Sequence, residues 1–448
     1  MRLMVLYASA CLLILCRAPG AFAQAPTSLT IEEAVTRGLG SAPRLSEARA
    51  REAAAAATDA ARVALGRPVL AVMSGMLRTN HVDLFGVPLA DGRTRIIFPD
   101  IPTNVHVRAE MSIPIFTGGR VEALVGSARS ERAAAAAETR AVAGDVTLEI
   151  TNAYWALVMV RERRAVLGRA VERADAVVSD VQAQVDAGVA PPNEVQTAQA
   201  QRARQRVQFI QAGADVEVAE AQLARLVGLA PGDPIVPTTP VNQPAGGLGE
   251  LAGLSAAALT ARAQASRPER AALVLREGSI RLAGRASEAA LLPQVAGLAA
   301  IEQARPNPRF VPRTDEWNRS WDLGVNVTWS VWDGGRARAE AAASSAQADA
   351  AHARVAEFDA GVAVEVRQRL ADLASGRAAI DASSEAVEAA REASRVLQER
   401  FAAGVAISTD LLDANLALLE AELERTRLAT VLRINEARLM RTVGGPTP

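Results

Sequence analysis

The chain has 448 residues, and its 49 basic and 50 acidic side chains give a formal net charge of −1 at pH 7. This balance offers no electrostatic reason to expect a nucleic-acid partner. Aromatic residues make up only 3% of the chain and alanine is abundant, which suits long, closely packed helices better than one large globular core.

Residues 1–23 are predicted to be a secretory signal peptide. Arg2 supplies the positive start, Val5–Cys16 the apolar stretch and Ala21-Phe22-Ala23 the cleavage site. A lipoprotein signal that lipidates Cys16 is an alternative, but bulky residues precede that cysteine where small ones are needed. Cleavage after residue 23 removes both cysteines of the chain, so no disulfide is expected.

Most of the remaining sequence consists of two copies of one repeat unit. The segments 105–120 and 321–336, which lie 216 residues apart, both end in Gly-Gly-Arg. Farther upstream the offset is 225 residues, so the first copy contains a loop nine residues longer. The predicted organisation is a first repeat at 24–228, a Pro/Gly-rich surface linker at 229–253 and a second repeat at 254–448.

Each repeat is predicted to run helix, strand, loop, strand, long helix, tight turn, helix. In the first repeat these elements are residues 30–65, 69–77, 105–116, 120–186 and 191–228. In the second they are 255–291, 293–302, 321–331, 336–402 and 408–443. Thr30 and Glu33 form a capping-box pattern at the start of the first helix.

The long helix of the first repeat carries a coiled-coil pattern. From Val146 to Val185 apolar residues alternate at spacings of four and three, and only Arg164 is polar. This repeat of 3.5 residues implies a left-handed supercoil against a partner helix. A bundle helix of a soluble protein fits the periodicity but not the length, because about 67 residues make roughly 100 Å of helix. The two shorter helices, placed end to end, match that length.

Two of the predicted strands alternate apolar and polar residues. Segments 105–115 and 321–331 do so for ten or eleven residues, the length of a tilted transmembrane strand. Trp321 and Trp329 lie on the apolar side at a spacing that reaches both interfacial girdles. A half-buried strand of a soluble protein shows the same alternation. Strands 69–77 and 293–302 alternate poorly, and their faces are not assigned.

The strands also limit how the chain can cross a membrane. No segment after residue 23 is long and apolar enough for a transmembrane helix, so a crossing requires the strands. Four strands cannot close a barrel, for which about eight are needed, and lipid does not tolerate open edges. Several chains must then share one barrel.

The sequence contains no pattern typical of an enzyme. After residue 23 it has three histidines and no cysteine, and no pair of them has the spacing of metal ligands. Neither a nucleophile motif nor a phosphate-binding loop is found. We therefore expect no catalytic residue, no cofactor and no bound metal.

The chain resembles the TolC family of outer-membrane efflux proteins. The similarity is carried by the duplicated unit, by Phe116–Arg120 and Trp332–Arg336, and by Arg400–Val405 followed by Thr409–Ala414. It implies a homotrimer that is mainly α-helical, with a coiled-coil tunnel in the periplasm and an outer-membrane β-barrel of three times four strands. Expected partners are outer-membrane lipid, a periplasmic adaptor (membrane fusion) protein and an inner-membrane pump of RND, ABC or MFS type.

The resemblance also suggests where the channel narrows. Asp410 and Asp413 match the family's lumen-facing pair of aspartates at the tunnel tip, and Glu194 is the equivalent of Asp410 in the first repeat. At i, i+3 spacing the two aspartates share one helix face. Asp410 also fits a helix start capped by Ser408 or Thr409, where an acid is favoured in any case.

The hairpin turns depart from the family pattern in two places. Phe401 and Ala406 replace polar residues, so Phe401 either closes the lumen as an apolar ring or packs in the coiled-coil seam. Adaptor docking is expected at four turn residues, namely Gly188, Val189, Gly404 and Val405.

The function indicated is a passive exit duct of a tripartite efflux or type I secretion system, gated at its periplasmic tip. The alternative is a soluble periplasmic coiled-coil scaffold without transport activity. A third possibility, the adaptor itself, predicts one helical hairpin rather than two full copies.

Overall fold

The computed structural model describes residues 27–230, 232–243, 248–251 and 253–445, and the predicted signal peptide lies outside them. In the first repeat the elements are β1 (Thr27–Leu29), α1 (Ile31–Ser41), α2 (Pro43–Ala64), β2 (Val69–Arg78), β3 (Phe85–Pro88), β4 (Thr94–Phe98), β5 (Thr103–Phe116), α3 (Arg120–Asp186) and α4 (Asn193–Val227). After it come β6 (Ile235–Pro237), η1 (Leu248–Leu251), α5 (Ala256–Ser266), α6 (Pro268–Glu288), η2 (Ala289–Leu291), β7 (Gln294–Arg305), β8 (Asn318–Thr328), α7 (Arg336–Ala402) and α8 (Ser408–Thr442).

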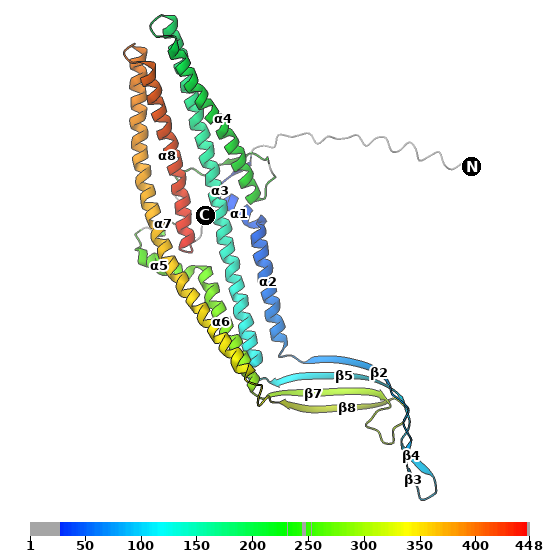
Figure 1. Cartoon of the computed structure of the whole chain (residues 1–448). Coiled ribbons are helices and arrows are strands. Elements are labelled where there is room, and N and C mark those ends of the chain that lie inside the picture. Colours follow the sequence, from blue (N-terminus) through cyan, green and yellow to red (C-terminus); the bar gives the residue numbers. More distant parts are fainter. Residues whose placement is uncertain (1–26, 231, 244–247, 252, 446–448) are drawn as a thin grey trace, which may run out of the picture.

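The helices lie side by side in a wall that ends in the strands (Figure 1). Next to the sheet the order across the wall is α2, α3, α6, α7, and toward the tips it is α4, α3, α8, α7. Helices α3 and α7, with 67 residues each, run through both halves. This arrangement confirms that the shorter helices pair end to end along each long one, and α2/α4 and α7 form the two edges of the wall.

The seam predicted along α3 is confirmed. Val146, Ile150, Leu157 and Leu167 are buried, and the other apolar seam positions are at least half-buried. The polar exception, Arg164, is exposed and lies over the ring of Phe209 with 5.4 Å between its guanidinium carbon and the ring centroid. An arginine is tolerated here because its stem covers an aromatic ring while its charge stays in water.

The predicted single helices at 30–65 and 255–291 are wrong, because each is broken into two. The breaks fall at Ala42-Pro43 and Arg267-Pro268, where the residue before proline is extended. Proline lacks the N–H that would continue the helix and pushes the preceding residue out of the helical region. The Thr30 capping box is present as predicted.

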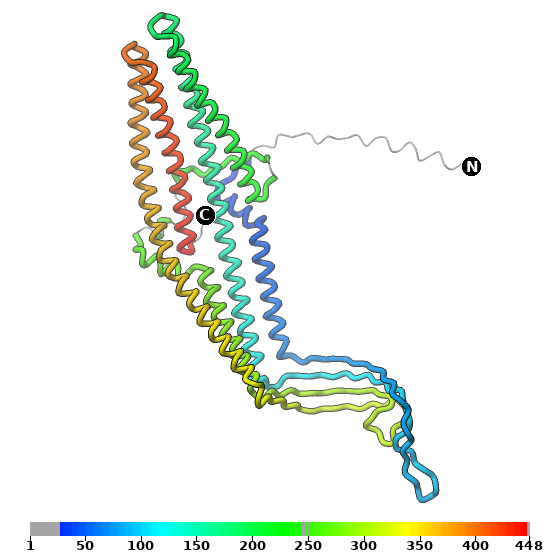
Figure 2. The backbone as a smooth tube through the Cα atoms, viewed as in Figure 1, coloured from blue at the N-terminus to red at the C-terminus, as the bar shows by residue number. Residues whose placement is uncertain are grey.

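Four long strands form one antiparallel sheet in the order β2, β5, β7, β8, so β2 and β8 are its edges. The last strand ends at Thr328, and Trp329 therefore lies just beyond it. The longer loop of the first repeat contains the β3–β4 hairpin, which extends past the sheet (Figure 2).

The segment 229–253 is more than a surface linker. Strand β6 pairs in parallel with β1, and Ile235, Leu248 and Leu251 are buried against the helices. The hydroxyl of Tyr154 accepts a hydrogen bond from the backbone N–H of Thr239 at 2.9 Å, so the segment is fastened to α3. Its proline content predicted that the segment 229–253 is rich in turns. The apolar residues between the prolines nevertheless pack against the helices.

Within the described residues, no helix is long and apolar enough to cross a membrane. Among the same residues no group of three potential metal ligands is found.

Candidate functional site

The two hairpin turns lie together at the end of the helical wall farthest from the sheet (Figure 1). Gly188 and Gly404 have positive φ angles of 72° and 73°, which residues with a Cβ rarely adopt. The N–H of the next residue, Val189 or Val405, donates to a carbonyl oxygen five residues earlier at 2.9 Å in each turn. Both turns therefore share one helix-ending motif, and both valines are more than half exposed.

The interior of the tip is apolar and joins the two hairpins. Its buried members come from α3, α4, α7 and α8, and they are Val177, Val181, Val195, Ala198, Phe401, Leu411 and Leu412. Phe401 is only 2% exposed, so its side chain lies in this packing and not on a free surface. The amide of Gln184 donates to the Phe401 carbonyl at 3.1 Å, a link between hairpins that the sequence did not reveal.

Asp410 and Asp413 lie on the opposite side of α8 from this packing. Both are exposed, while Leu411 and Leu412 between them are buried. In the part of the chain that the structure describes, neither aspartate forms an ion pair. The N-cap of α8 is Ile407 and no side chain caps the helix, so the predicted cap by Ser408 or Thr409 is wrong. Asp410 still lies in the first turn, where the helix dipole favours an acid.

Glu194 occupies the matching place in the first turn of α4 and is half-buried. Beside the aspartates lies Ile407, the residue before α8; its place at the start of the apolar spacing of α8 suggests a seam residue, but its side chain is 59% exposed. The tip therefore presents carboxylates and isolated apolar side chains around a packed interior.

The sheet register assigns the faces of all four strands, including the two that alternate poorly in sequence. Directly paired residues of antiparallel strands share a face. Val107 pairs with Ser74 on β2 and Gln303 on β7, and Leu323 pairs with Ala299. One face therefore carries the even positions of β2 and the odd positions of β5, β7 and β8. This apolar face is open in the single chain.

Both tryptophans predicted as girdle residues are exposed. Trp321 is on the apolar face of β8 and is 70% exposed. Trp329 follows β8, and its indole N–H donates to the carbonyl of Leu291 at 3.0 Å. A spacing of eight residues in extended chain corresponds to about 26 Å, close to the height of a membrane-facing apolar band. Trp332, which is 85% exposed, adds a third aromatic at the helix end of the sheet.

The opposite face holds a network of charges. Arg108 donates to Asp322 at 2.9 Å and to Glu110 at 3.1 Å, and Glu302 lies 3.7 Å away. Arg309, from the loop between β7 and β8, pairs with Asp322 as well. Two arginines thus meet three carboxylates across three strands, which suits a water-filled interior and not lipid.

The strand-to-helix junctions are built alike in the two repeats. Thr117 accepts a hydrogen bond from the N–H of Val121 at 3.3 Å, and its equivalent Asp333 accepts from Ala337 at 2.8 Å. The N–H groups of Ala337 and Gly335 hold the pKa of Asp333 below its ordinary value. These hydrogen bonds satisfy one backbone N–H in the first turn of each long helix, whose N-cap residues are the glycines Gly119 and Gly335.

A cluster of charges around the buried Arg441 fastens the C-terminal end of α8 to its neighbours. The guanidinium of Arg441 donates to Asp145 on α3 at 2.7 Å and pairs with Glu269 on α6. Burial acts to raise the pKa of Glu269, but the hydrogen bond and charge of Arg441 outweigh it and lower that pKa. A Cβ on Gly144 would lie 2.9 Å from Nε of Arg441, so this glycine makes room for the arginine.

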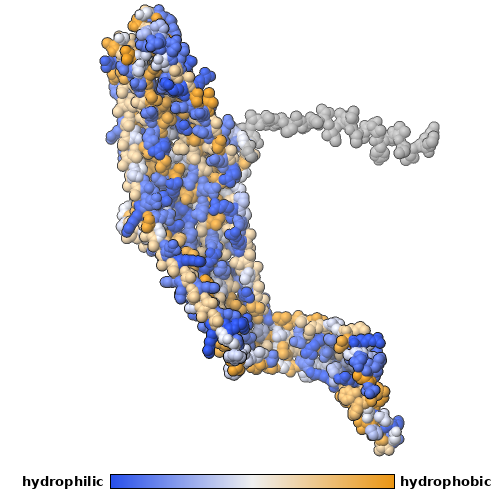
Figure 3. Space-filling model, in the orientation of Figure 1, coloured by the Kyte–Doolittle hydropathy of each residue, from blue (hydrophilic) through white to orange (hydrophobic). Residues whose placement is uncertain are grey.

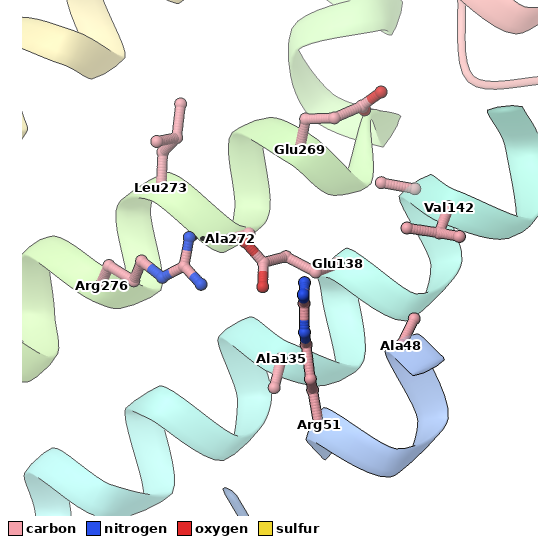
Figure 4. A pocket seen from close by; sticks show the side chains of 10 residues that line it. Ala48, Arg51, Ala135, Glu138, Val142, Glu269, Ala272, Leu273 and Arg276 are labelled. Atoms are coloured by element: carbon pink, nitrogen blue, oxygen red, sulfur yellow. Dashed lines mark ion pairs between the residues drawn. The ribbon is translucent and has the colours of Figure 1, made fainter. Parts of the chain in front are cut away.

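A cavity of roughly 370 Å³ lies where α2, α3 and α6 meet (Figure 4). Its floor is largely alanine, and the guanidinium of Arg276 points toward Glu138, 2.5 Å away. Arg51 reaches in from α2. The cavity exists because the side chains around it are small. The charges of Arg276 and Glu138, which face each other across it, are paired, so the cavity offers no catalytic arrangement.

The surface of the single chain exposes many hydrophobic side chains, which suits contact with partners. Hydrophobic side chains are spread over the helices and over the sheet and are not confined to the interior (Figure 3). On the apolar face of the sheet, the exposed large hydrophobic residues include Leu70, Val72, Leu323 and Val325.

The sequence model of the family described as outer membrane efflux protein matches residues 35–229 and 259–445. A comparison with curated protein sequences gives no match.

Several solved structures share the fold. The outer-membrane channel OprN is 21% identical, with a TM-score of 0.74 over 93% of this chain and 90% of that one. The outer membrane protein VceC from Vibrio cholerae is 18% identical, with a TM-score of 0.74 over 93% and 96% of the two chains. The open state of the MtrE outer membrane channel from Neisseria gonorrhoeae is 18% identical, with a TM-score of 0.74 over 93% and 89%.

Proposed function

The chain belongs to the outer membrane efflux protein family, and we propose that three copies of it form a passive exit duct from the periplasm to the exterior. Family membership makes the chain an outer-membrane efflux channel and not an enzyme, with its helices in the periplasm. It also sets aside the soluble scaffold considered from the sequence.

The main support for the trimer is that the four-stranded sheet has two free edges. One face of this sheet is apolar and the other carries charges, so it fits between lipid and water. Unpaired edges are not tolerated in lipid, and pairing β8 of one copy with β2 of the next removes them. Such a head-to-tail contact closes into a ring when the rotation allows.

Three copies are proposed because a duct requires a barrel with a water-filled interior. Two copies would supply eight strands, and a barrel of about eight strands is filled by its own side chains. Three copies supply twelve strands and leave room for water around the charge network of Arg108. The edges of the helical wall support the same ring, because α4 exposes Val207 and Ile210 and α7 exposes Val364.

The tip is proposed as the narrowest point of the duct. Three copies would bring six carboxylates of Asp410 and Asp413 together, with Glu194 nearby, and such rings favour cations. Phe401 is left out of this constriction because it packs inside one chain. The exposed valines of the two turns are proposed as contacts for a periplasmic adaptor, which would connect the duct to an inner-membrane pump of RND, ABC or MFS type.

Disulfide trapping tests the ring. Cleavage of the signal peptide leaves no cysteine, so cysteines introduced in pairs along β2 and β8 meet no background thiol. Oxidation in isolated outer membranes should give dimer and trimer bands and nothing larger. Cysteines at Val107 and Gln303, which pair within one chain, serve as the control and should leave the protein monomeric on a denaturing gel. Monomers at every tested register, or bands beyond the trimer, would contradict the proposal.

A further inference from the structure

The apolar face of the sheet ends in a row of arginines at the side away from the helices. Arg78 on β2 pairs with Thr103, Arg305 on β7 pairs with Val105, and Arg319 on β8 pairs with Gln303. Because paired residues share a face, these three arginines lie on the face that carries Trp321. We call Arg78, Arg305 and Arg319 the arginine row.

Between the arginine row and the helices this face carries no charge along the four described strands. Its residues are Leu70, Val72, Ser74 and Met76 on β2, Val105, Val107, Ala109, Met111 and Ile113 on β5, Val295, Gly297, Ala299, Ile301 and the uncharged polar Gln303 on β7, and Trp321, Leu323, Val325 and Val327 on β8. All the acidic residues of these strands lie on the opposite face. The arginines therefore mark one boundary of an apolar band and do not belong to a mixed water-exposed surface.

We propose that the arginine row binds the phosphate groups of an anionic glycolipid in the outer leaflet, whose acyl chains lie along the apolar face. This inference rests on the proposed function, because it takes the sheet as membrane-spanning and the helices as periplasmic. With that orientation the free end of the sheet faces the exterior. Trp321 lies two residues inward of Arg319 on the same face, the order expected at a boundary between acyl chains and head groups.

The chemistry favours phosphate over other partners. A guanidinium presents paired donors that match two oxygens of one phosphate, and its apolar stem can stay within the acyl layer. In the described part of the chain Arg78 and Arg319 form no ion pair, and both are exposed. Arg305 is held by Asp315 at 2.8 Å and so keeps only part of its donor capacity. The row thus offers two unpaired guanidinium groups flanking a paired one.

Native mass spectrometry of the detergent-purified trimer tests the proposal, with diphosphoryl lipid A as the probe and phosphatidylcholine as the neutral comparator. Wild-type protein should bind lipid A more tightly than phosphatidylcholine. In the triple variant Arg78→Gln, Arg305→Gln, Arg319→Gln, the dissociation constant for lipid A should rise by roughly tenfold or more. The corresponding triple lysine variant keeps the charge and should lose less.

A matched variant removes the same number of exposed charges from the helical hairpin, through Arg169→Gln, Arg204→Gln and Arg206→Gln, and should bind lipid A as the wild type does. Equal lipid A affinity of the wild type and the arginine-row variant would overturn the proposal, as would equal affinity for lipid A and phosphatidylcholine.

Two further measurements keep the test decisive. If the triple variant does not assemble, Arg319→Gln alone should still weaken lipid A binding by about threefold, and an unchanged value would overturn the proposal. Conductance of the same preparations in planar bilayers separates this inference from the proposed function. Channels that conduct normally without lipid A preference would refute the lipid site and leave the duct intact.

Discussion

The helical hairpins and the four-stranded sheet place their apolar residues in opposite ways. Along α3 the seam residues are buried against α1, α4 and α8 of the same chain, and the tip has its own apolar interior. On β8, Trp321, Leu323 and Val325 are 70%, 77% and 65% exposed. The hairpins are therefore stabilised largely within one chain, whereas in the proposed ring the sheet would be covered by neighbouring copies and lipid.

This difference determines under which conditions a substitution should change the stability of the protein. A change in the helical wall should alter stability in detergent and in membranes alike. A change on the apolar face should act only where that face meets lipid or detergent. The internal repeat supplies matched controls for testing this division.

The largest effect is expected at Arg441. Replacing it with glutamine removes the partner of Asp145 and leaves Glu269 with only the more distant Arg267, whose Nε lies 3.5 Å away. Loss of one partner of a buried pair costs about 3–5 kcal/mol, and the partial exposure of Asp145 places the expected value near the lower limit. Thermal unfolding of the purified trimer measures it.

The first repeat provides the control for this variant. Arg225 is the equivalent of Arg441, but it is exposed and lies 3.7 Å from Glu149. Arg225→Gln should cost only about 0–1 kcal/mol. Equal losses in the two variants would mean that the cluster around Arg441 does not hold α8 in place.

A somewhat smaller effect is expected on the apolar face. Val325→Arg puts a charge on the lipid side of β8 and should cost about 2–4 kcal/mol near the middle of the membrane. Asn326→Ser changes the neighbouring residue on the water side and should leave assembly nearly intact. Trimer yield from outer membranes and urea unfolding in lipid vesicles compare the two variants, and identical behaviour would show that the faces are assigned wrongly.

A still smaller effect is expected from acidification. The pKa of Glu269 in the folded protein is lower than its ordinary value of 4.5. Its contribution to stability is therefore complete above that value and is lost as the pH falls through the lowered pKa. The unfolding temperature should decrease below about pH 4.5, and Glu269→Gln should make that decrease shallower. The same slope in both proteins would exclude Glu269 from the acid response.

Local signals in the sequence predicted the repeat, the long helices and the hairpin turns well. The bounds of α3 and α7 and the glycines at the turns follow from chain-breaking residues whose effect does not depend on distant contacts. The breaks at Pro43 and Pro268 follow from the same chemistry, but a continuous apolar pattern on either side concealed them. The strand bounds were less certain because pairing, not sequence, ends a strand.

Other features could not be predicted because they depend on contacts between distant segments. The faces of β2 and β7 become clear only from their register with β5, since both faces of these strands carry apolar residues. The packing of Leu248 and Leu251 needs the helices that cover them. The sequence left Phe401 open between lumen and seam, and the cluster around it places it in the seam. The role of the tip aspartates remains a proposal.

Single-channel recording in planar bilayers tests the central claim that three helical tips form a cation-selective constriction. The wild-type trimer should prefer cations and be blocked by multivalent cations, and 1 M salt should weaken both effects, because the Debye length falls to about 3 Å. The double variant Asp410→Ala, Asp413→Ala should lose most of the selectivity and block. Asp381→Ala, Glu385→Ala removes two exposed acids of α7 far from the tip and should behave as the wild type. Unchanged selectivity and block in the tip variant would contradict the claim.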